Sequence, residues 1–370
     1  MPLGQTEGAP VVSTLRSTIS EHASQVGLDA IRFAPAGASP HGQAFQRWID
    51  AGFHGEMAYL SRDVAIRLDP RTRMPGAKTA VVVAMNHAHR RPADPGGLTG
   101  AVARYAWGRD YHNLFGKRIR RLVKRLRAAG MGAWGGVDTA PILERNWAWA
   151  AGAGFVGKNT LIIVPGTGSW LLLGVMFVDA PLAEPAAPPL GDHCGRCRRC
   201  LDVCPTDAFV EDRVLDARKC LSYWNIESRD LPPRPLRRSF GRWFFGCDRC
   251  QEVCPHNHHP PDADHPDLAP RHAWIDLPEV LATPDSALLD RFTGTPLRRP
   301  GAVGLKRNAA ICLGNLGQPD AVEPLTRYGL VHPEPVVRAA TVWALHQLGH
   351  PASVTDRHPL VQAELHAVNG

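Results

Sequence analysis

The chain has 370 residues, which suits two or three domains, and 44% of them are hydrophobic, so it can bury a sizeable core. Lys and Arg number 42 against 35 Asp and Glu, and the net charge of +7 favours a polyanionic partner. The longest apolar run, 170–178, is far shorter than the roughly 20 residues of a membrane span, and residues 1–8 lack the basic and apolar regions of a signal peptide. We therefore expect a cytoplasmic protein without a membrane partner, in which nine cysteines serve as ligands or nucleophiles rather than disulfides.

Helices and strands mix through the first part of the chain. Apolar periodicity and β-branched runs predict, in chain order, a helix over 12–30, a strand over 80–85, a basic amphipathic helix over 113–129, and strands over 161–164 and 170–178. Gly27 should end the first helix. A further helix is predicted to begin after Asp138 and Thr139. This mixture indicates an α+β domain.

The composition then changes twice. Residues 181–191 are rich in Pro and Ala and indicate a linker, and 192–258 contain eight of the nine cysteines. The segment 306–317 is echoed by 337–349, a pattern typical of HEAT-like helix pairs, with two ordinary Ala-rich core helices as the alternative. We therefore expect three domains: an N-terminal α/β domain over 1–180, a ferredoxin-like domain over 181–265 and a helical HEAT-like unit over 266–370.

The spacing of the cysteines is the strongest chemical signal. Cys194-x2-Cys197-x2-Cys200-x3-Cys204-Pro205 is the bacterial ferredoxin run, in which three thiolates bind one [4Fe–4S] cluster and the fourth points to a second cluster. A second run, Cys247-x2-Cys250-x3-Cys254-Pro255, has Phe244 where its first cysteine belongs, and Cys220 can fill that vacancy. Crosswise ligation then gives two sets, Cys194, Cys197, Cys200 and Cys254 for cluster one, and Cys204, Cys220, Cys247 and Cys250 for cluster two. Cys312 remains as a buried apolar residue, and structural zinc is the alternative metal.

Two clusters in a small lobe are typical of electron transfer, so the N-terminal domain should hold the electron acceptor. The Gly-rich segment 152–157 follows a helix pattern rather than a strand, so it does not support a dinucleotide site. The segment 110–116 is a near miss to the Asp-x-His-x-x-Gly motif of one cobalamin-binding class, which gives weak support to His112 as a corrin ligand.

Three further polar residues attract attention in this domain. Asp138 follows two glycines, and it is either a helix N-cap or a general acid in a buried site, where a raised pKa would let the carboxyl group donate a proton. Lys158 and Asn159 either bind an anionic group of a cofactor or lie on the surface.

Several motifs along nearly the whole chain resemble epoxyqueuosine reductase. They are GEMAYL at 55–60, RLDP at 67–70, RYAWGRDYH at 104–112, VDTAP at 137–141, GKNT at 157–160, LDARKC at 215–220 and GCDRCQ at 246–251, followed by the HEAT-like tail. The resemblance implies reduction of epoxyqueuosine to queuosine at the wobble base of a tRNA anticodon, the last step of queuosine biosynthesis. It also implies electrons that pass through two [4Fe–4S] clusters to a cobalamin without a histidine ligand from the protein.

The resemblance assigns roles to single residues. Asp138 matches the proposed proton donor, and Arg67 matches a cobalamin-contacting arginine. Lys158 and Asn159 fall in a segment that lines the corrin, and Ser222 falls in another such segment. A cobalamin-dependent reductive dehalogenase is the second hypothesis, although those enzymes usually carry an export signal and lack a HEAT-like tail. A ferredoxin-like electron carrier is the third, and it leaves the first 180 residues unexplained.

A tRNA anticodon stem-loop would account for the positive charge, because RNA is bound largely through its phosphates. Candidate phosphate contacts, each of which is otherwise a solvated surface residue, are Arg234, Arg237, Arg238, Arg298, Arg299, Lys306 and Arg307. An unidentified reductant protein would supply the electrons, and we expect the chain to act as a monomer.

Overall fold

A four-stranded antiparallel sheet organises the N-terminal part of the chain. The computed structural model describes residues 8–28, 30–183 and 190–369. The strands are β1 (Ala30–Pro35), β2 (Thr79–Asn86), β4 (Ala133–Gly136) and β7 (Leu171–Val178), in the order β1-β2-β7-β4. The strands predicted over 80–85 and 170–178 are confirmed as β2 and β7, which pair with each other along their whole lengths at the centre of the sheet.

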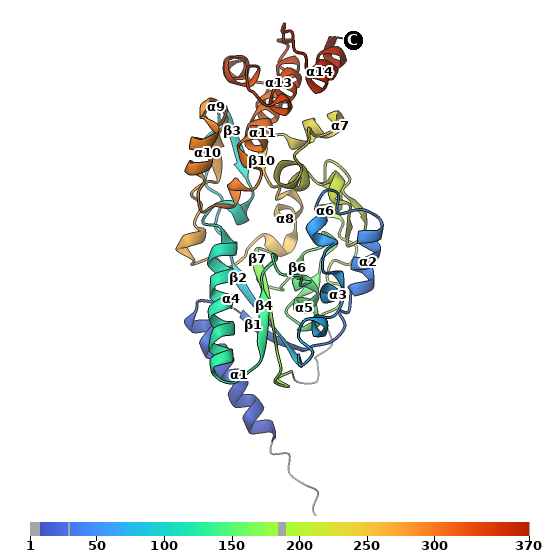
Figure 1. The fold of residues 1–370 in the computed structure, drawn as a ribbon, viewed down its shortest axis with the longest axis vertical. Helices are drawn as coiled ribbons and strands as arrows, with labels where there is room; N and C mark the ends of the chain where they lie inside the picture. The colour runs from blue at the N-terminus through green and yellow to red at the C-terminus, as the bar shows by residue number, and fades with distance from the viewer. Residues whose placement is uncertain (1–7, 29, 184–189, 370) are drawn as a thin grey trace, which may run out of the picture.

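Helices cover both faces of this sheet (Figure 1). On one face, alternate β2 residues such as Val81 and Val83 share a core with Phe115 and Ile119 of α4 (Tyr111–Ala128), and α1 (Gly8–Gln25) packs beside it. On the other face, Val82 shares a core with residues of α5 (Glu144–Ala150); α2 (Gly42–Asp50) and α3 (Val64–Leu68) also lie on this side. The expected period-two alternation thus sends side chains of β2 into two cores.

The predicted elements differ from the structure mainly at their ends and partners. The predicted helix over 113–129 is confirmed as α4, but the first helix already ends at Gln25, because the chain turns at Gly27 (φ 74°) and enters β1. The prediction of a helix directly after Asp138 is wrong, since α5 begins only at Glu144 after a series of turns. The strand predicted over 161–164 shrinks to β6 (Ile162–Ile163), which pairs with β5 (Phe155–Val156) outside the main sheet.

Short elements carry the cysteines between the sheet domain and the C-terminal helices. They are α6 (Arg199–Asp202), β8 (Phe209–Glu211), β9 (Val214–Leu215), a π-helix (Tyr223–Glu227), α7 (Arg234–Arg237) and α8 (Arg249–Glu252). Each ferredoxin-like run includes one of the two short helices α6 and α8, which contact each other near the middle of the molecule (Figure 1). The predicted linker over 181–191 lies in part outside the described residues.

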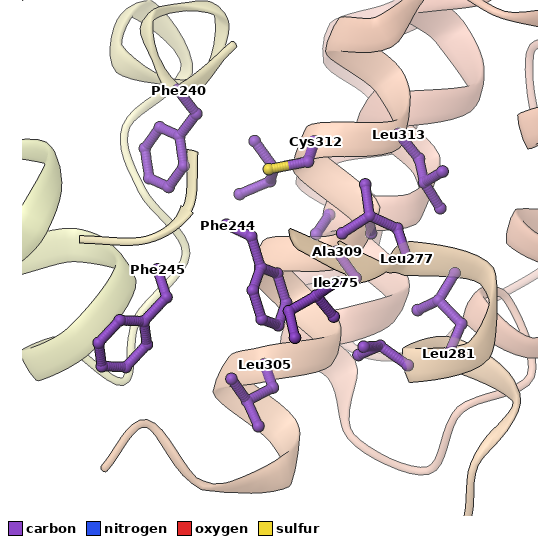
Figure 2. Packing of buried hydrophobic residues seen from close by; sticks show 14 of the residues in the cluster. Phe240, Phe244, Phe245, Ile275, Leu277, Leu281, Leu305, Ala309, Cys312 and Leu313 are labelled. Atoms are coloured by element: carbon purple, nitrogen blue, oxygen red, sulfur yellow. The ribbon is translucent and has the colours of Figure 1, made fainter. Parts of the chain in front are cut away.

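A second sheet joins segments that are far apart in the sequence. Its central strand is β3 (Thr99–Val102), which pairs in parallel with β10 (Trp243–Phe245) and antiparallel with β11 (Trp274–Asp276). Phe244 of β10 is fully buried and packs toward Leu305 and Ala309 of α11, as Figure 2 shows. The residue that stands in the vacant cysteine position therefore belongs to a hydrophobic core.

The C-terminal part consists of α9 (Leu277–Ala282), α10 (Asp285–Arg291), α11 (Gly301–Leu316), α12 (Val322–Pro324), α13 (Pro335–Gln347) and α14 (Pro359–Asn369). The two echoed sequence segments are α11 and α13, which pack closely along each other. A Cβ atom on Gly314 would lie 2.7 Å from the Cα atom of Ala344, so a larger residue there would force the two helices apart. In the described ranges, no helix combines the length and the apolar character needed to cross a membrane.

Candidate functional site

The cysteines of the first predicted set surround a common space. A cavity of about 170 Å³ is lined by Cys194, Cys197, Cys200 and Cys254 together with the side chains of nearby residues. Burial raises the pKa of the Cys200 thiol to about 11, and the other three thiols of this set raise it further. The fold therefore brings together the three cysteines of the first run and the last cysteine of the second, which is the crosswise grouping predicted from the spacing.

The second predicted set is also brought together. Burial raises the pKa of the Cys247 thiol to about 12, with a further contribution from Cys220, and Cys204 in turn lies close enough to raise the pKa of Cys220. Burial likewise raises the pKa of the Cys250 thiol, and Cys247 and Cys220 add to the shift. Burial favours the neutral form of these thiols, so a metal bound to them would have to displace their protons.

Three residues expected at the corrin lie beside the cysteines. Lys158 and Asn159 are buried in the wall of the first cavity. The Lys158 ammonium group forms an ion pair of 3.2 Å with Asp212, and the Asn159 amide donates a hydrogen bond of 3.3 Å to the carbonyl oxygen of Cys250. The Ser222 backbone and hydroxyl hydrogen bond to the thiol of Cys220.

Asp138 lies in a polar network at the start of α4. Its carboxylate accepts a short hydrogen bond from the Tyr111 hydroxyl and lies 2.9 Å from Nε2 of His112, whose Nδ1 is 2.7 Å from Asp110. Asp110 is the N-cap of α4, so the helix start fixes the positions of both neighbouring rings. Because both nitrogens of His112 already face carboxylates, the structure gives no support to this histidine as a corrin ligand.

Two expectations for Asp138 are corrected by its position. It is not a helix N-cap, because α5 begins later and its N-cap residue is Leu143. The side chain is also 48% exposed rather than buried. The turns between β4 and α5 place the carboxyl group at the surface of this domain, so it is accessible to a large substrate.

Buried polar atoms without partners lie near this network. Among the described residues, Nε of Arg67, Oε1 of Glu144 and Nδ2 of Asn146 are buried and have no hydrogen-bond partner. Burial raises the pKa of the Glu144 carboxyl to about 8, and the charge of Asp138 adds to this shift. Leaving such atoms unpaired costs about 1–3 kcal/mol each, so they are suited to bind polar groups of a ligand. Sequence reasoning missed Glu144 and Asn146; their signal is two polar residues inside a short Trp- and Ala-rich helix.

A second cavity, of about 200 Å³, is lined by one residue of the Asp138 network and by two sequence neighbours of the second cysteine set. Tyr111, which donates to Asp138, lines it together with Tyr105 and His87. Asp248 and Gln251, which flank Cys247 and Cys250, line it as well. The cavity therefore brings Tyr111 of the carboxylate network to the same space as residues from the segment that carries Cys247 and Cys250.

Of the seven basic residues proposed to contact phosphates, the structure removes three. Arg237, Lys306 and Arg307 are buried, at 3%, 5% and 0% exposure, so the prediction that they contact tRNA phosphates is wrong. Arg307 donates hydrogen bonds of 2.6–2.9 Å to the carbonyl oxygens of Trp224, Ser228 and Asp230. Its guanidinium group is therefore occupied within the fold.

The remaining four basic residues differ in availability. Arg234 is ion-paired with Glu364 at 3.0 Å, and Arg299 is ion-paired with Glu227 at 2.7 Å. Arg238 and Arg298 are exposed. These two are the best placed of the seven to meet a polyanion.

Comparisons with known proteins identify three segments of the chain. Residues 67–139 match the family described as epoxyqueuosine reductase QueG, DUF1730; residues 193–257 match the 4Fe-4S double cluster binding domain; and residues 299–356 match HEAT repeats. The epoxyqueuosine reductase of Pseudomonas aeruginosa is 36% identical over 364 residues, which cover 94% of this chain and 98% of that protein. The enzyme of Escherichia coli is 35% identical over 82% of each chain.

Solved structures agree with these matches. An epoxyqueuosine reductase bound to an epoxyqueuosine-modified stem loop of tRNA-Tyr has a TM-score of 0.89 at 27% identity, over 96% of this chain and 98% of that chain. The Bacillus subtilis enzyme, whose structure shows a catalytic loop with an aspartate swung out of the active site, has a TM-score of 0.86 at 27% identity and the same coverage.

Proposed function

The chain belongs to the epoxyqueuosine reductase family and reduces epoxyqueuosine to queuosine in tRNA, and from this premise we propose which of its residues do so. The observation that carries the proposal is a cavity lined both by Tyr111, which donates to Asp138, and by Asp248 and Gln251, the sequence neighbours of Cys247 and Cys250. In this arrangement Asp138, which could transfer protons, would share one site with the second cluster, which would supply electrons.

The two cysteine sets would hold the two [4Fe–4S] clusters of the double cluster domain. The loop 191–199 around the first set is largely exposed, whereas β10 and Asp248 beside the second set are buried. We therefore assign the entry of electrons to cluster one and their delivery to cluster two, whose cysteines Cys247 and Cys250 are next in sequence to the cavity residues Asp248 and Gln251. A reductant protein would dock near the exposed loop.

Cobalamin fits the polar atoms that the fold leaves unpaired. Its amide groups and phosphate offer acceptors to Arg67 and Asn146 and donors to Glu144, the buried groups without partners. Lys158, Asn159 and Ser222 remain proposed corrin contacts that also border the cysteine sets. Both ring nitrogens of His112 face carboxylates, which agrees with a cobalamin that takes no histidine from the protein. When bound, the cobalt supplies the two-electron chemistry.

The substrate would be the anticodon stem-loop of a tRNA that carries epoxyqueuosine. The half-exposed Asp138 is accessible to a base that has been turned out of its loop. Arg238 and Arg298 are the proposed phosphate contacts. Asp138 would give its proton to the epoxide oxygen as the carbon–oxygen bond breaks.

The direct test is anaerobic reconstitution with iron, sulfide and cobalamin, followed by mass spectrometry of epoxyqueuosine-containing tRNA. We expect queuosine to form only with both cofactors and a reductant. Unchanged epoxyqueuosine in the fully loaded protein would contradict the assignment.

The cluster ligands have a matched test in two cysteines of this chain. Cys220→Ala should remove one cluster and lower the iron content from about eight to about four atoms per chain, because a cubane needs four thiolates. Cys312→Ala should keep both clusters, because Cys312 is buried in the C-terminal core. Eight iron atoms in the Cys220 variant would show that Cys220 is not a cluster ligand.

A further inference from the structure

The chemistry of the reaction requires more protons than one carboxyl group holds. Converting an epoxide to an alkene and water consumes two electrons and two protons, because the oxygen leaves both carbons and departs as water. Asp138 supplies one proton each time it is protonated, so it must be protonated again within one turnover. A side chain that reloads Asp138 has to lie within hydrogen-bond reach of it, directly or through one water molecule.

Two side chains meet this condition. The Tyr111 hydroxyl donates to Oδ2 of Asp138, and Nε2 of His112 lies 2.9 Å from Oδ1 and 3.0 Å from Oδ2. Burial and the neighbouring Asp138 charge raise the pKa of Tyr111 well above its usual value, so the phenol keeps its proton and orients the carboxylate. The imidazole is therefore the member of the pair that can exchange a proton.

The other side of the imidazole is held by a second carboxylate. Nδ1 of His112 lies 2.7 Å from Asp110, which also accepts the backbone N–H of His112 at 2.9 Å as the N-cap of α4. The rings of Tyr111 and His112 stack with their centroids 4.1 Å apart. These contacts fix Nε2 toward Asp138, and they form a continuous chain Asp110–His112–Asp138.

We propose that His112 is the proton store of the reaction, which reloads Asp138 through Nε2 while Asp110 holds the imidazole in place. This inference rests on the proposed role of Asp138 as the proton donor. In this proposal His112 acts on the substrate only through Asp138, and Asp110 is a positioning residue for His112.

The charges around His112 agree with this role. Burial lowers the pKa of its imidazole, but the hydrogen bonds and charges of Asp110 and Asp138 outweigh burial and raise it to about 9. Burial raises the pKa of Asp110, but its bonds to His112 and the Arg299 charge lower it overall, so Asp110 stays ionised. The imidazole is thus charged at neutral pH, and its 23% exposure lets it regain a proton from water.

The step balances as follows. A proton passes from Nε2 of His112 to the carboxylate of Asp138 and on to the epoxide oxygen, and the first carbon–oxygen bond breaks. Neutral His112 takes a proton from solvent and repeats the transfer, so that the second carbon–oxygen bond breaks and water leaves. The two electrons that form the carbon–carbon double bond come from the reductant of the established reaction.

The test compares His112→Ala with His346→Ala, a histidine exposed at the end of α13. With pre-reduced holoenzyme and epoxyqueuosine-containing tRNA, we expect the single-turnover rate at pH 7 to fall about 100-fold in the His112 variant and to be unchanged in the control. The wild-type rate should fall as pH rises through about 9, since His112 then loses its proton, and the variant should lack this limb. Added imidazole should restore part of the rate in the His112 variant only.

A second readout does not depend on turnover. Diethyl pyrocarbonate modifies neutral imidazole, so peptide mass mapping of the holoenzyme should show His112 protected until about pH 9, and reactive at lower pH in Asp138→Asn. A rate within threefold of wild type for His112→Ala, or a loss without imidazole rescue and with the alkaline limb intact, would overturn the proton store. If Asp138→Asn converts tRNA at the wild-type rate, the proposed role of Asp138 as proton donor is wrong. That outcome can be told apart from a failure of the His112 proposal, because the protection of His112 in the wild type would be unchanged.

Discussion

Two polar clusters in this molecule differ in their exposure to solvent and in their hydrogen-bond partners. At the start of α4, Asp138 and His112 keep exposed surface, and their carboxylate and imidazole face each other with water in reach. In α11, Arg307 and Asn308 are fully buried, and all their partners belong to the fold: Arg307 donates to three carbonyl oxygens, and Asn308 donates to those of Asn225 and Phe244. We propose that the first cluster serves chemistry, whereas the second connects α11 with the cysteine-bearing lobe.

The difference shows that the sign of a charge does not identify a binding surface. Arg307 and Arg298 look alike in the sequence, since both are basic residues close to the beginning of the predicted repeat. Only the second is exposed. A basic side chain binds phosphate only if its donors are not already used, and buried carbonyl oxygens compete for arginine donors as strongly as phosphates do in water.

The largest effect should come from the exposed cluster. Asp138→Asn keeps the size of the side chain but removes its proton-transfer function, so we expect single-turnover conversion of epoxyqueuosine-tRNA to fall by about 10²–10⁴-fold. The free energy of unfolding should fall only modestly, because the carboxyl group is half-exposed and water screens its pairing with His112. Near-normal conversion with intact cofactors would break the distinction drawn between the two clusters.

The buried cluster should show the reverse. Arg307→Met removes the donor of one buried carbonyl oxygen, that of Ser228, and of two partly buried ones. A buried unsatisfied acceptor costs about 1–3 kcal/mol, so we expect a loss of at least about 2 kcal/mol in unfolding free energy. Urea unfolding measures this. Arg327→Ala is the control, because its ion pair with Glu323 is exposed and is worth less than about 0.5 kcal/mol. Equal stability of the two variants would contradict a structural role for Arg307.

The pH dependence of the unfolding free energy tests the exposed cluster through His112. The pKa of this imidazole is raised from 6.5 to about 9 in the folded state, so its contribution is fully present below pH 6.5 and is lost as pH rises through about 9. We expect urea midpoints measured at pH 6.5 and 9.5 to differ more in the wild type than in His112→Gln, and equal differences would contradict the shift.

The smallest effect concerns the exposed arginines. Replacing Arg238 or Arg298 by alanine should each lower the salt slope of anticodon stem-loop binding by about 1, because each proposed phosphate contact releases about one counterion. Fluorescence anisotropy at several salt concentrations measures the slope. Arg71→Ala is the control, since Arg71 is held by Asp69 at 2.6 Å. An unchanged slope in both variants would place the tRNA elsewhere.

The parts of the fold that were predictable have local causes. Ligand spacing within a cysteine run follows from the geometry of one cluster, so residues 194–204 could be interpreted without knowledge of the fold. The period of α4 reports its own buried face, and the echo between α11 and α13 reports two similar helices. In each case, the information lies within a short stretch of chain.

The unpredicted parts depend on contacts between distant residues. Asp138 was singled out, but its partners Tyr111 and His112 come from another helix, and the sequence near His112 indicated a metal ligand instead. The burial of Arg307 depends on carbonyl oxygens of the π-helix region, far away along the chain. Neither set of contacts leaves a periodic or spacing signal in the sequence. Only the structure shows which arginine side chains already donate hydrogen bonds within the fold.

The second sheet has a consequence for the order in which this protein is made. Strand β3 is complete when residue 102 leaves the ribosome, yet both of its partners, β10 and β11, are synthesised about 140 or more residues later. At a translation rate of about 5–20 residues per second, the central strand waits for roughly ten seconds or longer with both edges unpaired. The metal-binding lobe emerges during this wait, so cluster insertion and closure of the sheet compete in time, and a chaperone or an early-bound cofactor would have most influence there.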